Sequence, residues 1–113
     1  MDPNGKHVLT AAVTDDGTIV VAGDIDMAGG PLLEEAILTR ETDLEHAASG
    51  DVVLDLEHVH FIDSSGLRGL LGASRRAASR RSAVVLRSVG PEIVRLLEIT
   101  GTLDQFNIVS RRD

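Results

Sequence analysis

Two short aliphatic runs stand on either side of a stretch with helical periodicity, and this arrangement constrains the fold most strongly. Residues 52–54 and 83–86 consist of valine, leucine and alanine, as buried strands often do. Over residues 67–78, apolar side chains recur three or four positions apart, with arginines on the other side. A helix between two strands joins them as parallel neighbours, so the chain is predicted to adopt an α/β fold. We expect the first strand to end with residues 55–57.

The chain is predicted to open with a β-hairpin. Residues 8–13 and 18–22 are strand-like apolar runs, and Asp15-Asp16-Gly17-Thr18 between them is a strong turn signal. The second run is rich in β-branched residues, which favour strands, and it is expected to end at residues 23–26. The two strands of this hairpin are antiparallel, so the sheet is predicted to contain both antiparallel and parallel pairs.

Two further helices and a last strand complete the predicted order. A helix opens at Pro31, where the missing backbone N–H is not needed, and it ends or bends before Gly50. Another helix opens at Pro91 and stops at Gly101, and residues 107–110 form a candidate edge strand. The order is therefore β-β-α-β-α-β-α-β, in a mixed, mostly parallel β-sheet with helices packed on it.

Composition excludes several classes of function. The 113 residues carry a formal net charge of -7, which disfavours nucleic acid and membranes as partners and favours a basic patch on another protein. Cysteine is absent, which excludes disulfides, thiolate chemistry and cysteine-based metal sites. The N-terminus lacks the apolar core of a signal peptide, and no apolar run approaches the ~20 residues of a membrane span, so we expect a cytoplasmic protein. With no repeat or linker, residues 1–113 are expected to form one domain.

Residues 59–67 place polar hydroxyls between a predicted strand and a predicted helix. Ser64 and Ser65 stand at the helix N-terminus, where unpaired N–H groups and the helix dipole favour an anion. A phosphate there would add about two negative charges without disturbing the helix. Asp24 and Asp26 are expected to lie beside the serines if both loops leave the same edge of the sheet. Their carboxylates would then repel the phosphate.

The same residues have a purely structural interpretation. Asp63 or Ser64 is of the type that caps a helix, and Gly66 would allow a close approach of helix and strand. Both interpretations stay open. They are compatible, because one residue can cap the helix while a neighbouring serine is modified.

Taken together, these features resemble the STAS domain (sulfate transporter and anti-sigma factor antagonist). The resemblance covers the order of the elements and extends over about residues 8–110. It is carried by four segments: GDID at 23–26, VVLDL at 52–56, FIDSSGL at 61–67 and ITG at 99–101. Within this superfamily, the chain most resembles stand-alone bacterial anti-sigma factor antagonists.

The resemblance implies regulation of transcription by partner switching. The unphosphorylated antagonist would bind an anti-sigma factor that is also a serine kinase, and so free the sigma factor. The kinase would use ATP to phosphorylate the antagonist and end the interaction, and a serine phosphatase would restore it. The alternative function is a STAS scaffold or transporter-accessory module that is never phosphorylated.

Residue by residue, the resemblance implies that Ser65 is the phosphorylated serine, with Ser64 as the second choice. Asp26 would assist recognition by the kinase. The residues expected to bind the partner are Asp24, Asp26, Asp63, Ser64, Gly66 and Arg68.

Two features depart from the family pattern. Gly29-Gly30-Pro31 replaces the usual Thr/Ser-Ala pair, and we interpret its glycines as a flexible opening to the helix. The sequence stops at Asp113, so the last amphipathic helix of many members is expected to be missing or very short. Both departures concern the identity of the partner and leave the acceptor serine unaffected.

Other constellations give weaker signals. Four histidines suggest a metal site: His7, His46, His58 and His60. No third ligand with suitable spacing accompanies the pair at 58 and 60, so solvated surface histidines are the preferred interpretation. Ser65 lacks the first glycine of a hydrolase nucleophile elbow, and no P-loop is present, so neither an enzyme nor a cofactor is expected. The arginines of residues 75–81 are interpreted as a solvated helix end, with a second docking contact as the alternative.

Overall fold

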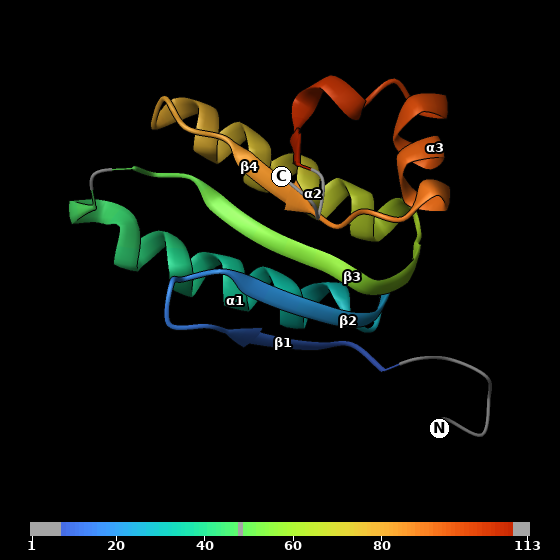
Figure 1. Ribbon diagram of the computed structural model, residues 1–113, viewed down its shortest axis with the longest axis horizontal. Coiled ribbons are helices and arrows are strands. Elements are labelled where there is room, and N and C mark those ends of the chain that lie inside the picture. Colours follow the sequence, from blue (N-terminus) through green and yellow to red (C-terminus); the bar gives the residue numbers. More distant parts are fainter. Residues whose placement is uncertain (1–7, 48, 110–113) are drawn as a thin grey trace.

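The computed structural model describes residues 8–47 and 49–109, and its strands and helices follow the predicted order (Figure 1). They are β1 (Thr10–Val13), β2 (Ile19–Ile25), α1 (Gly30–Asp43), β3 (Val52–Ile62), α2 (Ser64–Ser79), β4 (Val84–Arg87), α3 (Pro91–Ile99) and β5 (Asn107–Val109). The strands lie in the order β1-β2-β3-β4-β5. β1 is antiparallel to β2, and the other neighbouring pairs are parallel. The predicted mixed, mostly parallel sheet of an α/β fold is therefore confirmed.

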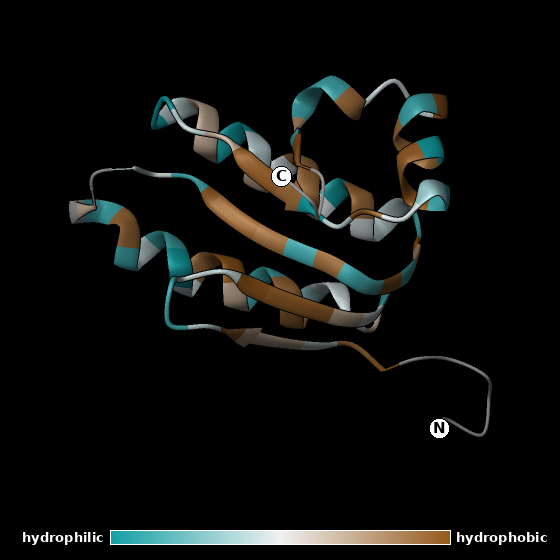
Figure 2. Ribbon diagram, viewed as in Figure 1, coloured by the Kyte–Doolittle hydropathy of each residue, from teal (hydrophilic) through white to brown (hydrophobic). Residues whose placement is uncertain are grey.

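The two long helices, α1 and α2, pack on the same face of the sheet, behind the strands in Figure 1. The inward side chains of the three central strands are aliphatic, and Ile19, Leu54 and Leu86 are completely buried among them. Figure 2 shows the apolar character of these strands. Of the two phenylalanines, Phe106 is buried in this core, whereas Phe61 is half exposed. Burial of aliphatic surface between the sheet and the helices is the main stabilising contribution.

The turn between β1 and β2 is fixed by a single carboxylate. Asp16 Oδ1 accepts hydrogen bonds from the Thr14 hydroxyl and from the Thr18 backbone N–H, the latter at 3.0 Å. Gly17 supplies the left-handed backbone conformation, with φ of +88°, that the turn requires. These hydrogen bonds, first that from Thr14 and then that from Thr18, lower the pKa of Asp16 to about 2. The predicted hairpin is confirmed.

β3 is longer than the sequence indicates. It runs over Val52–Ile62, so the expectation that it ends with residues 55–57 is wrong. β3 contributes an extra residue at each of two register shifts against β2. Near these shifts, residues 57 and 58 are both exposed, and so are residues 60 and 61. Such neighbouring exposed residues interrupt the alternation of buried and exposed side chains that is typical of a strand. As a result, only Asp63 separates β3 from α2.

The helices begin and end close to their predicted boundaries. α1 ends at Asp43 and a 3₁₀ turn, Leu44–His46, follows it, which agrees with an end before Gly50. α3 ends at Ile99, and Gly101 follows with φ of +71°. None of the helices in the described part of the chain combines the length and the apolar character needed to cross a bilayer.

Arg76 of α2 and Arg80, the C-cap residue that follows it, form ion pairs with Glu41 of α1. Arg76 Nε lies 3.0 Å from both carboxylate oxygens of Glu41, and Arg80 Nη1 lies 3.7 Å from one of them. The interpretation of residues 75–81 as a solvated helix end is therefore wrong for Arg76 and Arg80. It holds for Arg75 and Arg81, which are exposed.

Candidate functional site

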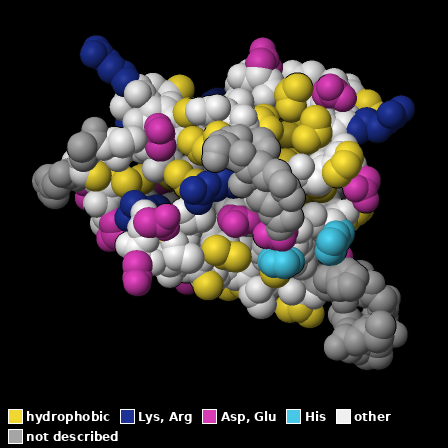
Figure 3. All heavy atoms as spheres, viewed as in Figure 1, with side chains coloured by type: hydrophobic (Ala, Val, Ile, Leu, Met, Phe, Trp, Pro, Cys, Tyr) yellow, Lys and Arg dark blue, Asp and Glu magenta, His cyan; other side chains and the backbone are white. Residues whose placement is uncertain are grey.

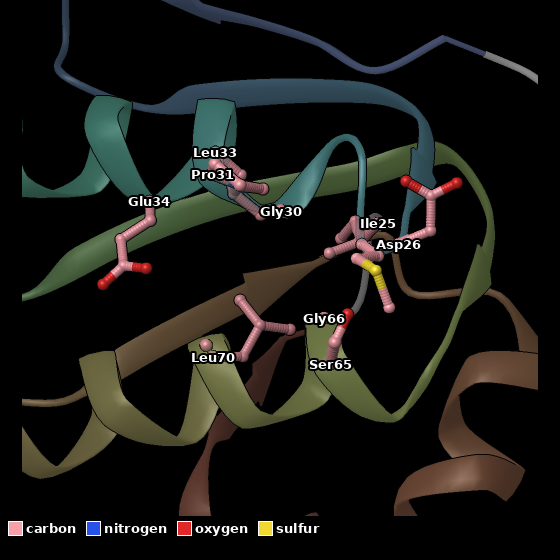
Figure 4. A pocket seen from close by; sticks show the side chains of 11 residues that line it. Ile25, Asp26, Gly30, Pro31, Leu33, Glu34, Ser65, Gly66 and Leu70 are labelled. Carbon is pink, nitrogen blue, oxygen red and sulfur yellow. The ribbon is translucent and has the colours of Figure 1, made fainter.

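The candidate site forms where β2 and β3 end. These strands are parallel, and Ile25 pairs with Ile62 at their carboxyl ends. The segment that leads from β2 to α1, residues 26–29, therefore lies next to residues 63–65, which open α2 (Figure 4). Residues about forty positions apart in the sequence are brought together at one edge of the sheet. Such an edge is a common location for binding sites in α/β folds.

Asp63 is the N-cap of α2. Its backbone is extended, and its Oδ1 accepts a hydrogen bond from the Gly66 N–H at 2.8 Å. Its own N–H donates to the carbonyl oxygen of Ile25 at 3.1 Å, which ties the start of α2 to the end of β2. Of the two residues considered as the cap, the structure assigns Asp63.

Gly66 brings the first turn of α2 against β2. A Cβ atom at this position would lie 2.2 Å from the carbonyl oxygen of Ile25 and 2.7 Å from its Cγ2. Neither contact is tolerable, because real Cβ atoms essentially never come this close to other heavy atoms. The predicted close approach of helix and strand is confirmed.

Ser65 faces the space between the two helices. Its hydroxyl donates a hydrogen bond to Asp63 Oδ1 at 2.9 Å, and its side chain is half-buried. It borders a cavity of about 200 Å³, drawn in Figure 4. The cavity is lined by Ile25, Asp26, Met27, Gly30, Pro31, Leu33, Glu34, Ser65, Gly66, Gly69 and Leu70. Ser64 is exposed and does not line it. Ser65 is thus partly exposed at the edge of this cavity.

Of the acidic residues expected beside the serines, Asp26 shares a cavity with Ser65, and Asp24 lies in a neighbouring hollow that neither serine lines. Asp26 lines the cavity that Ser65 borders. Asp24, Asp26 and Asp63 also line a second hollow, together with Met27, Ala28 and Phe61. Hydrogen bonds, chiefly from the Gly66 N–H and also from the Ser65 hydroxyl, lower the pKa of Asp63. Asp63 is therefore a carboxylate at neutral pH.

The opening to α1 is packed rather than flexible. Gly29 is buried, and a Cβ there would lie 2.7 Å from both the Asp24 carbonyl oxygen and the Leu9 Cβ. Its N–H donates to Asp26 Oδ1 at 2.7 Å. The interpretation of Gly29 as a source of flexibility is wrong, because only glycine lets the chain pass this close to Leu9. At Gly30, by contrast, a Cβ would meet nothing within 4 Å.

Two apolar residues of this edge were not among the predicted site residues. Met27 is 78% exposed and Phe61 is 49% exposed, and both line the hollow that contains Asp24 and Asp63. Met27 could have been found from the sequence, because it is a large apolar residue in an otherwise acidic loop. For Phe61, the signal was hidden by the register shifts of β3, which turn two successive residues outward.

Other predicted residues lie away from the cavity. Arg68 is exposed on α2 and lines neither hollow. His58 and His60 are exposed, and histidines are visible at the surface in Figure 3. His7 and the side chain of His46 lie outside the described residues. Within residues 8–47 and 49–109, no group of three potential metal ligands is found.

Comparison with known proteins agrees with this architecture. The STAS domain family matches residues 9–113. The chain is similar to the anti-sigma-B factor antagonist of Listeria monocytogenes, with 35% identity over 96 residues, which are 84% of this chain and 80% of that protein. A crystal structure of an anti-sigma factor antagonist from Mycobacterium paratuberculosis matches with a TM-score of 0.72 and 26% identity, over 95% of this chain and 87% of the other.

A more distant structure shares the fold alone. The Bacillus cell fate determinant SpoIIAA, solved in its phosphorylated form, matches with a TM-score of 0.63 and 18% identity, over 91% of this chain and 90% of the other. The family match covers nearly the whole sequence, and the Listeria relative is matched over most of its length. The chain therefore belongs to the STAS domain family.

Proposed function

We propose that this protein is an anti-sigma factor antagonist that acts by partner switching, with Ser65 as the phosphorylated residue. The observation that carries the proposal is the position of the Ser65 hydroxyl. It stands at a helix N-terminus and borders an open cavity beside Asp26. The names of the Listeria and Mycobacterium relatives support the same role. In this role the protein is a regulator and has no catalytic activity of its own.

A phosphate on Ser65 would change the docking surface without changing the fold. The first turn of α2 accepts an anion, because its N–H groups and the helix dipole face that way. The added charge of about two units would, however, stand beside the carboxylate of Asp63, at the cavity that Asp26 also lines. The edge that attracts a partner would then repel any acidic group of that partner and present extra bulk.

The chemistry of this edge fits a partner that docks by apolar contacts and carries an acidic group that a phosphate on Ser65 would repel. Met27 and Phe61 are exposed among three carboxylates, and the whole chain carries a net charge of -7. Apolar anchors surrounded by charged groups are typical of transient protein interfaces. The partner in this scheme is an anti-sigma factor with serine kinase activity, which brings its own ATP, and a serine phosphatase reverses the reaction in the cytoplasm.

Phosphorylation assays with serine variants test the proposal. The protein is incubated with ATP and the anti-sigma factor kinase that co-purifies with it, and the modified residue is mapped by mass spectrometry. We expect the wild type to carry one phosphate and Ser65→Ala to lose it. Ser64→Ala should be phosphorylated nearly as well as the wild type. Undiminished phosphorylation of Ser65→Ala would remove Ser65 from the role. A wild type that binds the partner tightly but never becomes phosphorylated would favour the scaffold function.

A charge at position 65 should weaken binding even without a kinase reaction. We expect Ser65→Asp to lower the affinity for the anti-sigma factor by about 1–3 kcal/mol, the scale of losing a charge-compatible contact. Ser64→Asp is the matched control, because Ser64 lies outside the cavity and should cost less. Isothermal titration calorimetry measures both. Equal affinities of Ser65→Asp and the wild type would contradict the charge mechanism.

A further inference from the structure

The two adjacent serines at the start of α2 are held in different ways. The Ser65 hydroxyl donates to Asp63 Oδ1 at 2.9 Å and borders the cavity, and in Figure 4 its oxygen points from α2 toward the segment between β2 and α1. Ser64 is exposed, and its hydroxyl makes no hydrogen bond to any residue in the described part of the chain. The more accessible serine is therefore the one whose hydroxyl is not oriented.

The carboxylate that orients Ser65 is itself fixed from two sides. Asp63 Oδ1 accepts the Gly66 N–H at 2.8 Å, and the Asp63 N–H donates to the Ile25 carbonyl at 3.1 Å. The contact between Gly66 and Ile25 leaves no room for the first turn to move toward β2. Asp63 is thus anchored to its own helix through the oxygen that receives the Ser65 hydrogen, and to the neighbouring strand through its backbone N–H.

We propose that Asp63 is a positioning residue that selects Ser65 over Ser64 as the phosphoryl acceptor. A hydroxyl has one donor hydrogen and two acceptor lone pairs. With its hydrogen directed at Asp63 Oδ1, Ser65 Oγ keeps its lone pairs for an incoming phosphorus atom. Ser64 would have to lose rotational freedom before it could react, and prior orientation of a reacting group lowers this entropic cost. The proposal rests on the partner-switching function and adds the reason for its site preference.

The transfer step balances with ATP as the phosphoryl donor. Ser65 Oγ bonds to the γ-phosphorus, the bond from that phosphorus to the bridging oxygen breaks, and ADP leaves with the electron pair. The hydroxyl proton is released to solvent. The low pKa of Asp63 makes it a weak base, so its role is to hold the hydroxyl in place rather than to deprotonate it. A loose transition state places little demand on early proton removal.

Two substitutions separate positioning from capping and from charge. Asp63→Ser keeps a good N-cap residue, but its shorter side chain does not extend to Ser65 Oγ. Asp63→Asn also caps the helix and keeps an oxygen at the Oδ1 position, but it has no charge and cannot accept a proton. We expect Asp63→Ser to lower kcat for phosphorylation about tenfold, with KM within about twofold, and to move part of the phosphate to Ser64. Asp63→Asn should restore most of kcat and the preference for Ser65.

The opposite results would overturn the proposal. Unchanged kcat and site preference in Asp63→Ser would show that Ser65 needs no orientation by Asp63. An Asp63→Asn variant as slow as Asp63→Ser would point to a base or a charge instead of a positioning residue. A rise in KM with kcat and the preference for Ser65 unchanged would show that Asp63 acts in partner binding only and does not orient Ser65. Thermal unfolding of each variant identifies any loss of rate that comes from loss of the folded state.

A measurement without a kinase distinguishes this proposal from the proposed function. Three-bond Hα–Hβ couplings report the side-chain rotamer of each serine by NMR. We expect one staggered rotamer for Ser65 in the wild type and in Asp63→Asn, and rotamer averaging in Asp63→Ser. Averaged couplings at Ser65 of the wild type would refute the orienting contact. Absence of any phosphorylation, with a single Ser65 rotamer retained, would refute the proposed function and leave the contact itself intact.

Discussion

At the scale of single residues, some glycines of this protein stand where a side chain would collide with backbone, and others do not. Gly66 and Gly69 both belong to α2, but their surroundings differ. A Cβ at position 66 would press into the Ile25 carbonyl at 2.2 Å, whereas a Cβ at position 69 would meet nothing within 4 Å. Glycine is also costly inside a helix, because it loses more backbone entropy on folding than alanine does. The two positions therefore respond to the same substitution in opposite directions.

We predict that Gly66→Ala lowers the free energy of unfolding by about 1–3 kcal/mol, because α2 must move away from β2 to admit the methyl group. The matched control, Gly69→Ala, should raise it by about 0.5–1 kcal/mol. Urea-induced unfolding followed by circular dichroism measures both. A neutral or stabilising Gly66→Ala would mean that the start of α2 is not pressed against β2.

At the scale of elements, the hairpin of β1 and β2 is sensitive to acid through Asp16. Its pKa of about 2 lies below the ordinary value of 3.8, because the ionised form accepts hydrogen bonds from Thr14 and Thr18 in the folded state. A lowered pKa means that the ionised carboxylate stabilises the folded state above about pH 3.8. That contribution falls away as the pH drops from there towards 2.

We therefore predict that Asp16→Asn lowers Tm at neutral pH and that its Tm converges with that of the wild type near pH 2. Thermal melts at about pH 7, 4 and 2 test this, and Asp15→Asn serves as the neighbouring control. A constant difference in Tm over the whole range would show that the charge of Asp16 does not contribute to stability.

Most elements could be predicted because their signals are local. The turn at Gly17, the prolines at 31 and 91 and the aliphatic strands each act within a few residues. The length of β3 could not be predicted, because its register shifts depend on how β2 lies beside it. The pairing of Arg76 with Glu41 could not be predicted either, since it joins residues 35 positions apart.

The candidate site was predictable to a similar extent. The resemblance of FIDSSGL to the STAS family pointed to Ser65, and its position after a strand indicated a helix N-terminus. The sequence left open whether Asp63 or Ser64 is the cap, since both residue types cap helices well. Only the backbone geometry decides this, because Asp63 alone has the extended conformation and the bond to Gly66. The tight packing of Gly29 also depends on a distant residue, Leu9.

At the scale of the whole molecule, the ion pairs of Glu41 and the proposed recognition site lie at opposite ends of α1 and α2. The ion pairs of Glu41 with α2 lie toward the C-terminal ends of α1 and α2, far along both helices from Ser65. The N-terminal ends of the same helices border the cavity with Asp26 and Ser65. A change of charge at the cavity can thus occur while the ion pairs at the opposite end hold the two helices together.

The outward position of Phe61 has a practical consequence. The chain contains no tryptophan or tyrosine, so its native emission gives no useful optical signal. Phe61→Trp would introduce a single indole, half exposed in the hollow beside Asp63. We expect its fluorescence to shift to the blue when a partner covers this edge, and to return when phosphorylation ends the complex. Stopped-flow spectroscopy could then follow both events in real time, and an emission maximum that does not change on mixing would mean that the partner docks elsewhere.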